Sequence, residues 1–388
     1  SNGLEKRPKL RFPGFDEPWK ETVLSSVLTE RNEYAEKDGT YEHATLSKEG
    51  IYGKTARYDR DFLVSTENKK YKVTHLGDLC YNPANLKFGV ICLNTYGDAI
   101  FSPIYVTFEI DASSDPDFIG AYLTRWDFIN RALKYQQGTV YERMAVSPED
   151  FVSIKCCFPQ KAEQTRLAEF ITLLDNRIAA QGKYVESLKK YKRGLLSAVF
   201  SQNVSMFSTA DFYAFSELAV RRSEKYDPKC NAHAACIELE HIEQETGRII
   251  GSTCADYQNS IKTVCKPGDV MFGKLRPYLR KYAFVQKECV CSSEIWSLIP
   301  TDIVIPKYLF YLIQSEAFMK VANVSSGTKM PRAEWSTIAK SGYLIPSKDD
   351  QQATVDILET TDRIIASHVA SYDRFIEYKK GLLQRLFI

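Results

Sequence analysis

The sequence has few histidines and lacks the short motifs that mark the common catalytic sites. Five histidines in 388 residues leave few options for general acid–base chemistry. No phosphate-binding loop of the G-x-x-x-x-G-K-[ST] or G-x-G-x-x-G kind is present, and neither is a G-x-S-x-G elbow or an H-E-x-x-H helix. These absences favour a binding protein over an enzyme.

Long apolar runs and an excess of charge of either sign are also missing. No run approaches the roughly 18 residues of a membrane span, and SNGLEKRPKLRF at the start lacks the apolar core of a secretory signal. We therefore expect a cytoplasmic protein. The net charge is only +2, so any binding of nucleic acid must come from local basic patches. The length of 388 residues is natural for two domains.

The ten cysteines include no Cys-x-x-Cys pair. In a large chain without an export signal, free thiols are expected in place of disulfides. A zinc site is the alternative, and its possible ligands would be Cys230, His233, Cys236, His241 and Cys254. Without a paired motif the spacing does not favour it, and we predict no metal site.

A long internal repeat organises the chain. YKRGLLSAVF (191–200) returns as YKKGLLQRLF (378–387), 187 residues later, with six of ten positions identical. Further matches run upstream at offsets of 187 to 191 residues: LLDNRIAA (173–180) with TTDRIIAS (360–367), FPQKAEQ (158–164) with IPSKDDQ (345–351), GTVYER (138–143) with GTKMPR (327–332), GDLCYN (77–82) with GDVMFG (268–273), and Arg31 with Arg222. Such a steady offset indicates a duplication with small loop deletions.

Each copy combines a mixed region with a long helix. Residues 99–110 and 281–300 are rich in β-branched and aromatic residues, as strands are, while 115–137 and 305–323 have the spacing of amphipathic helices. The predicted fold is α+β: two mixed domains separated by two long antiparallel helices that form a coiled coil, with a pseudo-twofold repeat. The expected boundaries are 1–160 for the first mixed domain, 161–203 for the central helix and linker, 204–346 for the second mixed domain and 347–388 for the C-terminal helix.

The two long helices carry matching heptad patterns, in steps of four and three residues from Leu167 and from Thr354. The apolar seam positions are Leu167, Ile171, Leu174, Ile178, Val185, Leu188 and Leu195 in the first helix, and Leu358, Ile365, Tyr372, Phe375 and Leu382 in the second. Polar exceptions coincide between the copies, because Gln181 corresponds to His368 and Lys192 to Lys379. Polar seam residues cost stability but set register and orientation.

A single helix of this kind cannot bury its seam alone. We expect each helix to be the other's partner, antiparallel and related by a pseudo-twofold axis. Two independent helical hairpins, each packed on its own domain, are the alternative.

Basic residues gather with tyrosines in both mixed domains. They are Lys48, Lys54, Arg57, Lys69, Lys70 and Lys72 in the first, and Lys274, Arg276 and Lys281 with Tyr278 in the second. Two similar domains on a fixed spacer suit a long ligand that carries information at two separated places, and duplex DNA is such a ligand. A solvated charged face is the alternative for each cluster.

The repeated G-T-x-x-x-R segment adds further candidates for DNA contact. These are Thr139 and Arg143 in the first copy, and Thr328, Lys329 and Arg332 in the second. Glycine allows the backbone to approach a phosphate closely, threonine can donate to phosphate, and arginine can bind phosphate or guanine. A plain turn before a strand would explain the glycine equally well.

The opening PKLRFPGFDEPWKE (8–21), the segment FPQKAEQTRLAEFITLLDNRI, then KKYKRGLLSAVF, and the second copy ending in YKKGLLQRLF resemble a DNA specificity subunit of a type I restriction-modification system. The resemblance covers essentially the whole chain. It implies two target-recognition domains, each reading one half of a bipartite DNA site, and helices that set the spacer between the halves.

The resemblance also implies partners and cofactors. Two modification subunits would methylate adenine with S-adenosylmethionine, and restriction subunits would use ATP and Mg for translocation and cleavage. No catalytic residue and no cofactor is expected in this chain. A rod-like adaptor that joins proteins without binding nucleic acid is the second hypothesis, and a gel-shift experiment with the modification partner present separates the two.

Overall fold

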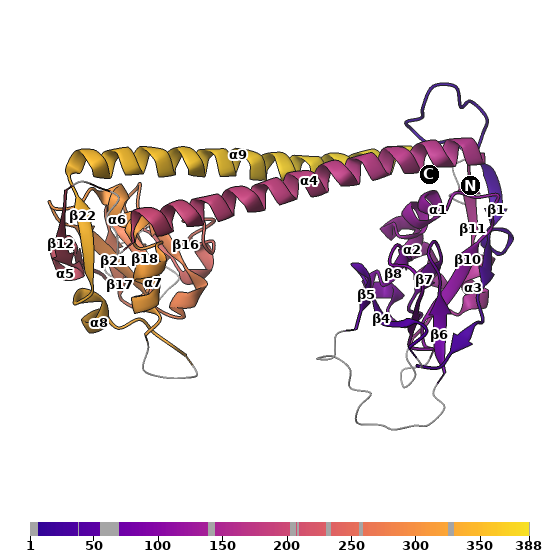
Figure 1. The fold of residues 1–388 in the computed structure, drawn as a ribbon, viewed down its shortest axis with the longest axis horizontal. Helices are drawn as coiled ribbons and strands as arrows, with labels where there is room; N and C mark the ends of the chain where they lie inside the picture. The colour runs from indigo at the N-terminus through magenta and orange to yellow at the C-terminus, as the bar shows by residue number, and fades with distance from the viewer. Residues whose placement is uncertain are drawn as a thin grey trace. The chain divides into compact units, whose positions relative to one another are not determined.

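The computed structural model describes residues 7–37, 39–54, 70–138, 144–201, 207, 209–229, 234–255, 259–324 and 330–387. The chain divides into two compact units, one formed by Ser1–Ala180 with Asp373–Ile388 and the other by Gln181–Tyr372. Each unit contains one sheet-rich head and a part of both long helices (Figure 1). The first head contains strands β1 to β11, and the second head contains strands β12 to β22.

The described residues of the first head form three small sheets, with strand orders β1-β11, β2-β10-β7-β8 and β3-β6-β9-β4-β5. Neighbouring strands are antiparallel except β4 and β9, which are parallel. The strands are β1 Lys20–Val23, β2 Leu28–Glu30, β3 Tyr34–Ala35, β4 Glu42–Ser47, β5 Gly50–Gly53, β6 Tyr71–Thr74, β7 Leu79–Tyr81, β8 Ile91–Leu93, β9 Ala99–Phe101, β10 Val106–Ile110 and β11 Lys155–Phe158.

The second head repeats this topology strand for strand, with orders β12-β22, β13-β21-β18-β19 and β14-β17-β20-β15-β16. The parallel pair recurs as β15 and β20. The strands are β12 Ala210–Ala214, β13 Ala219–Arg221, β14 Lys225–Tyr226, β15 Ala235–Ile237, β16 Thr253–Cys254, β17 Lys262–Cys265, β18 Val270–Gly273, β19 Tyr282–Phe284, β20 Cys289–Cys291, β21 Ile295–Pro300 and β22 Gly342–Pro346. The duplication read from the sequence is therefore a duplication of the fold.

The amphipathic segments expected at 115–137 and 305–323 each form two short helices. In the second head a new helix starts at Ser315, whose hydroxyl accepts a hydrogen bond from the Phe318 amide. In the first head Asp115 caps the first helix through the Phe118 amide. The helices are α1 Pro116–Leu123, α2 Trp126–Ala132 and α3 Pro148–Ser153 in the first head, and α5 Phe215–Leu218, α6 Pro306–Leu312, α7 Glu316–Ala322 and α8 Trp335–Ala339 in the second.

The long helices are α4, Lys161–Val199, and α9, Lys348–Leu386, each of 39 residues. At about 1.5 Å per residue, each is about 58 Å long. Neither contains a proline, and each starts with acidic residues in its first turn, which favour the positive end of the helix dipole. None of the described helices is both long and apolar enough to cross a bilayer.

A repeated glutamine fastens each long helix to its head. The Gln164 side chain accepts from the Asp115 amide at 2.9 Å and donates to the Pro159 carbonyl at 3.0 Å. Its counterpart Gln351 accepts from the Ile305 amide at 2.8 Å and donates to the Pro346 carbonyl at 3.0 Å. Both amides are buried and hydrogen-bonded, so this glutamine fixes the start of the long helix to the preceding strand and to the first short helix.

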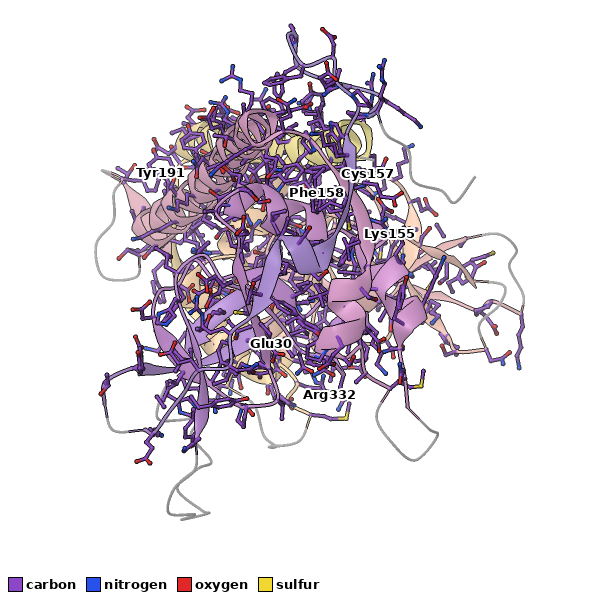
Figure 2. All side chains as sticks on the ribbon, turned by 90° about the vertical axis from the view of Figure 1, so that its right-hand side faces the viewer. Glu30, Lys155, Cys157, Phe158, Tyr191 and Arg332 are labelled. Carbon is purple, nitrogen blue, oxygen red and sulfur yellow. The ribbon has the colours of Figure 1, made fainter. Side chains whose placement is uncertain are left out.

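Both long helices complete the cores of the heads. In the first head, Leu167 and Ile171 from α4 join Leu382 and Leu386 from α9 in one hydrophobic cluster with the aromatic side chains of the head. In the second head, Leu196 from α4 and Val355 and Leu358 from α9 do the same. Within the first head, Cys157 and Phe158 on β11 lie near the helices, whereas Glu30 lies toward the opposite end (Figure 2).

The apolar seam positions listed above, and the polar ones Gln181, Lys192, Thr354, His368 and Lys379, are all buried or half-buried. The helices run antiparallel within each unit. In the first unit Asp175 pairs with Lys379, and the Arg177 guanidinium lies over the Phe375 ring. In the second unit, Gln181 Nε2 lies 3.0 Å from His368 Nδ1. Each helix is thus the partner of the other, and the separate-hairpin alternative does not apply.

Candidate nucleic-acid interface

An arginine–aspartate pair forms the same buried centre in both heads. Arg31 holds Asp78 with two hydrogen bonds of 2.9 and 3.1 Å, and Arg222 holds Asp269 with two of 2.6 and 2.7 Å. The hydrogen bonds to the carboxylates raise the pKa of both guanidiniums above the ordinary value. The repeated arginines and the repeated Gly-Asp dipeptides are therefore structural, and they position the loops that leave β7 and β18.

The loop after β18, residues 274–281, is called turn 274–281. It contains a single turn of 3-10 helix, Pro277–Leu279, flanked by Arg276 and Arg280 in the left-handed region, with φ values of 50° and 49°. Non-glycine residues rarely adopt this conformation, and it persists only where the surroundings enforce it. Among the non-glycine residues that the structure describes, only Glu245 also has a positive φ.

Backbone hydrogen bonds enforce the shape of turn 274–281. The Arg276 amide donates to the Pro331 carbonyl, and the Ala333 amide donates to the Lys274 carbonyl, both at 2.8 Å. Arg280 closes the other side, because its carbonyl accepts from the Glu245 amide at 3.0 Å and its guanidinium pairs with Glu316 at 2.6 Å. The turn is thus rigid and lies beside the segment that carries Arg332.

Three predicted residues of the second head project from this region. Arg276 and Tyr278 are exposed, and no ion pair is recorded for Arg276 in the described part of the chain. Arg332 is also exposed, but it holds Glu294 through two hydrogen bonds of 3.0 and 3.2 Å, which raise its pKa. A ligand that binds Arg332 must therefore compete with a carboxylate.

The two predicted lysines of turn 274–281 differ in accessibility. Lys274 is half-buried and its backbone is fixed on both sides. Lys281 donates from Nζ to the Leu239 carbonyl at 2.6 Å, so its charge serves to hold the β15 side of the head. This bond uses one of the three donors of the ammonium, and a DNA contact of Lys281 stays a prediction.

In the first head, the predicted basic cluster divides in the same way. Lys48 and Lys70 are exposed and Lys54 is half-buried. Lys72 is buried in β6, where its ammonium donates to Glu30 at 3.0 Å and to Asn32 at 2.9 Å. Its counterpart Lys262 in β17 donates to Glu238 at 2.8 Å. These two lysines neutralise internal carboxylates, and Lys72 is therefore not placed to contact DNA.

Several predicted contacts lie outside the described residues. They are Arg57, Lys69, Thr139, Arg143, Thr328 and Lys329. Of the two G-T-x-x-x-R segments, the structure describes Gly138, which has a φ of 149°, and Arg332.

Sequence reasoning missed the first-head counterpart of turn 274–281. Residues 82–89, called turn 82–89, leave β7 and form a 3-10 turn at Leu86–Phe88. Lys87 and Phe88 are exposed, and the Lys87 ammonium lies 5.2 Å from the centre of the Phe88 ring. The turn is not rich in basic residues, so the search for basic clusters passed over it. The repeat could have revealed it, because residues 86–88 lie 191 positions before 277–279, the same offset that separates the two Gly-Asp dipeptides.

The alternative metal site gains no support. Cys230 and His233 lie outside the described residues, and the described part of the chain contains no group of three potential ligands. His241 Nδ1 accepts a hydrogen bond from the Glu238 amide at 3.0 Å. Burial raises the pKa of the Cys236 thiol to about 11, so it is a neutral thiol at physiological pH.

Comparison with known families supports the resemblance seen in the sequence. Residues 226–373 match the family described as the type I restriction modification DNA specificity domain. The chain is 22% identical over 269 residues to the type I restriction enzyme MjaVIII specificity subunit of Methanocaldococcus jannaschii, covering 62% of this chain and 63% of that one. It is 30% identical over 145 residues to the HindI specificity subunit of Haemophilus influenzae, covering 35% and 31%. The matched parts thus span less than two thirds of either relative.

Solved structures share the fold along nearly the full length. A chain from a study of complex assembly and conformational transition in the type I R-M system matches with a TM-score of 0.60 at 15% identity, over 96% of this chain and 98% of that chain. The type I restriction-modification S subunit from M. genitalium matches with a TM-score of 0.55 at 15% identity, over 98% and 99%. Residues 226–373 thus carry the type I restriction modification DNA specificity domain, and the chain is similar in sequence to type I specificity subunits.

Proposed function

We propose that this chain recognises a bipartite sequence in double-stranded DNA and directs adenine methylation and restriction by partner subunits. Each head reads one half of the site, and a spacer of unspecified sequence separates the halves. The observation that carries the proposal is the duplicated head, with its topology repeated strand for strand and its exposed turn after β7 or β18. A ligand that suits two such heads carries information at two separated places.

The first target-recognition domain is residues 1–160 and the second is residues 204–346. Helical segments 161–203 and 347–388 set the distance between them. The residues proposed to contact DNA are Lys48, Lys54 and Lys70 with Lys87 in the first head, and Lys274, Arg276, Tyr278 and Arg332 in the second. Arg57, Lys69, Thr139, Arg143, Thr328 and Lys329 remain predicted contacts. Lys72 is left out, because its buried ammonium already bonds to Glu30 and Asn32. Lys281 remains a predicted contact as well, since its bond to the Leu239 carbonyl uses only one of its donors.

The chemistry is assigned to the partners. Two modification subunits would bind S-adenosylmethionine and methylate an adenine in each half-site, and restriction subunits would use ATP and Mg. The specificity chain would act in the cytoplasm, where it selects the site and holds the subunits there.

Mapping methylated adenines across the host genome, with and without the gene for this chain, tests the proposal. We expect one bipartite motif to lose methylation in the deletion strain, and a gel shift of that motif by the assembled complex. Methylation unchanged by the deletion, together with no shift, would mean that the chain is an adaptor and does not bind nucleic acid.

A further inference from the structure

Turns 82–89 and 274–281 share a geometry that their sequences do not share. Each leaves the end of a strand that is paired on both sides, β7 or β18, and each contains one turn of 3-10 helix, Leu86–Phe88 or Pro277–Leu279. In both, the residue after this helical turn is left-handed: Gly89 has a φ of 77° and Arg280 a φ of 49°. The first residue of each helical turn, Leu86 or Pro277, is buried and anchors it.

Beyond this anchor, each turn exposes one large aromatic side chain. Phe88 is 60% exposed and Tyr278 is 55% exposed. Single apolar residues on a surface are ordinary, but the two heads place an aromatic ring on the same rigid turn, one position apart in the repeat. A shared position in two domains with different loop sequences indicates a shared task.

Each turn carries a cation as well as a ring. Lys87 lies over the Phe88 ring, and Lys274 stands four residues before Tyr278 in turn 274–281. In contacts with DNA, cations hold phosphates and apolar or aromatic side chains enter between base pairs. An exposed aromatic residue without a neighbouring cation would have no such contact with the phosphates of the duplex.

The second turn is also strained and held in place. Two residues of turn 274–281 have left-handed backbones. The Arg276 amide donates to the Pro331 carbonyl, and the Arg280 carbonyl accepts from the Glu245 amide, and these hydrogen bonds fix them. Strain of this kind is retained where a preformed shape serves a function. The backbone that carries Tyr278 is therefore held in place before any ligand arrives.

We propose that Phe88 and Tyr278 are wedges, each of which enters one base step of the half-site that its own head reads. This inference rests on the proposed function. A methyltransferase must take its target base out of the stack, and this extrusion costs free energy. A ring inserted at the neighbouring step unstacks the duplex and so lowers the cost of extrusion for the partner subunit.

The test uses the full chain assembled with its modification subunits and the bipartite duplex identified by methylation mapping. One adenine of one half-site is replaced by 2-aminopurine, whose fluorescence rises when it leaves the stack. We expect the wild-type complex to raise the fluorescence in either half-site. Phe88→Ala should abolish the rise in one half-site and Tyr278→Ala in the other, and each should weaken binding about 10-fold or more.

Matched controls show whether the effect of the alanine variants comes from the loss of a wedge or from the loss of any exposed apolar side chain. Leu76→Ala, at the other end of β7, removes a side chain that is 69% exposed, and Val220→Ala in β13 removes one that is 52% exposed. Both controls should behave as wild type. Tyr278→Phe should retain the fluorescence rise, because it keeps the ring. A mismatch at the probed base pair weakens stacking in advance and should rescue both alanine variants, whereas it would not rescue a misfolded head.

Alanine variants that still unstack both half-sites would overturn the wedge, and so would variants that a mismatch does not rescue. If the alanine variants do not fold, Phe88→Leu and Tyr278→Leu replace them, with the same expected loss of the fluorescence rise. Wild-type complex that fails to bind the duplex specifically would contradict the proposed function itself. If the wild-type complex binds the duplex specifically and the alanine variants bind it equally well, only the wedge is contradicted.

Discussion

At the scale of single residues, the same ion pair organises both heads. Asp269 accepts two hydrogen bonds from Arg222, one from Ser297 on β21 and one from the Lys266 amide. It thus joins β13, β18 and β21 and the turn that precedes β18. These donors satisfy the hydrogen-bonding capacity of the buried carboxylate and hold it at this junction. The repeat of Arg31 and Arg222 in the sequence reflects this role.

Asp269→Ala should destabilise the second head strongly. The change leaves the Arg222 guanidinium largely buried without its carboxylate, and removing one partner of a buried pair costs about 3–5 kcal/mol. Glu294→Ala is the matched control, because it also removes a carboxylate that an arginine holds with two bonds, but at an exposed site. Urea unfolding should show a large fall in the free energy of unfolding for the first variant and little change for the second. Equal effects would contradict this assignment.

Arg276→Ala should relax the DNA sequence at one position of one half-site. An exposed arginine on a fixed backbone can bind guanine with two hydrogen bonds, and such a contact discriminates by about 1–3 kcal/mol. The measurement is binding of the assembled complex to a panel of single-base variants at two salt concentrations. Lys274→Ala should instead weaken binding to all sequences and lower the salt slope by about one unit. Relaxed discrimination in the half-site of the first head would show that turn 274–281 is misplaced.

Single lysines also show how far a sequence can specify a site. Lys72 and Lys281 stand in basic, tyrosine-rich segments, yet their ammonium groups bond to oxygens of the head. The apolar stem of a lysine can be buried. The number of lysines in a segment therefore does not tell whether their ammonium groups face solvent or the interior of the head. Turn 82–89 gave no such signal, because Lys87 is the single basic residue in its sequence.

At the scale of elements, a salt bridge that occurs in both units explains the two lysines at seam positions. Lys192 pairs with Asp362 at 2.6 Å in the second unit, and Lys379 pairs with Asp175 in the first. Adding the repeat offset of 187 converts 175 and 192 into 362 and 379, so these are two copies of one contact. Gln181 and His368 are equivalent to each other and meet. Polar residues at these positions fix the antiparallel register, because a shift would leave them unpaired.

Leu358→Asp should disrupt the second unit, whereas Ile357→Asp should not. The two residues are neighbours in α9, but Leu358 is 1% exposed in the core cluster and Ile357 is 57% exposed. An unpaired carboxylate in an apolar core costs several kcal/mol. Thermal unfolding followed by circular dichroism should show a large loss of stability for the first variant only. Similar melting of both variants would mean that the seam is assigned to the wrong face.

The elements differ in how well the sequence predicts them. The heptads of α4 and α9 could be read directly, because helix periodicity is a local pattern that repeats over many turns. The segments 115–137 and 305–323 were read as single helices, since the cap at Ser315 interrupts a continuous apolar pattern. The strand orders of the sheets could not be predicted, because pairs such as β1 with β11 join residues about 135 positions apart.

At the scale of the whole molecule, each half of the duplicated sequence completes the core of the other. Phe387 belongs to the cluster of the first head, where it lies beside Phe118 and Tyr122, and its counterpart Phe200 belongs to that of the second head, beside Tyr308. The chain therefore cannot be cut at its midpoint without removing helix from both units. This exchange explains why the segment around 191–200 had to be repeated at 378–387.

The last prediction concerns the spacing of the half-sites. One heptad inserted after Lys183 in α4 and another after Ala370 in α9 preserves the seam, since both positions are equivalent in the repeat and a heptad keeps the pattern. The insertion adds about 10 Å of helix, the length of about three base-pair steps. Methylation mapping should then return the same half-sites with a longer gap between them.

The same heptad inserted into α4 alone is the control for this experiment. It leaves seven residues without a partner on α9, so the assembly should weaken and no new gap should become preferred. An unchanged gap in an intact complex with both insertions would mean that the helices do not set the spacing. Changed half-sites would mean that base recognition extends beyond the two heads, because neither insertion alters a residue of either one.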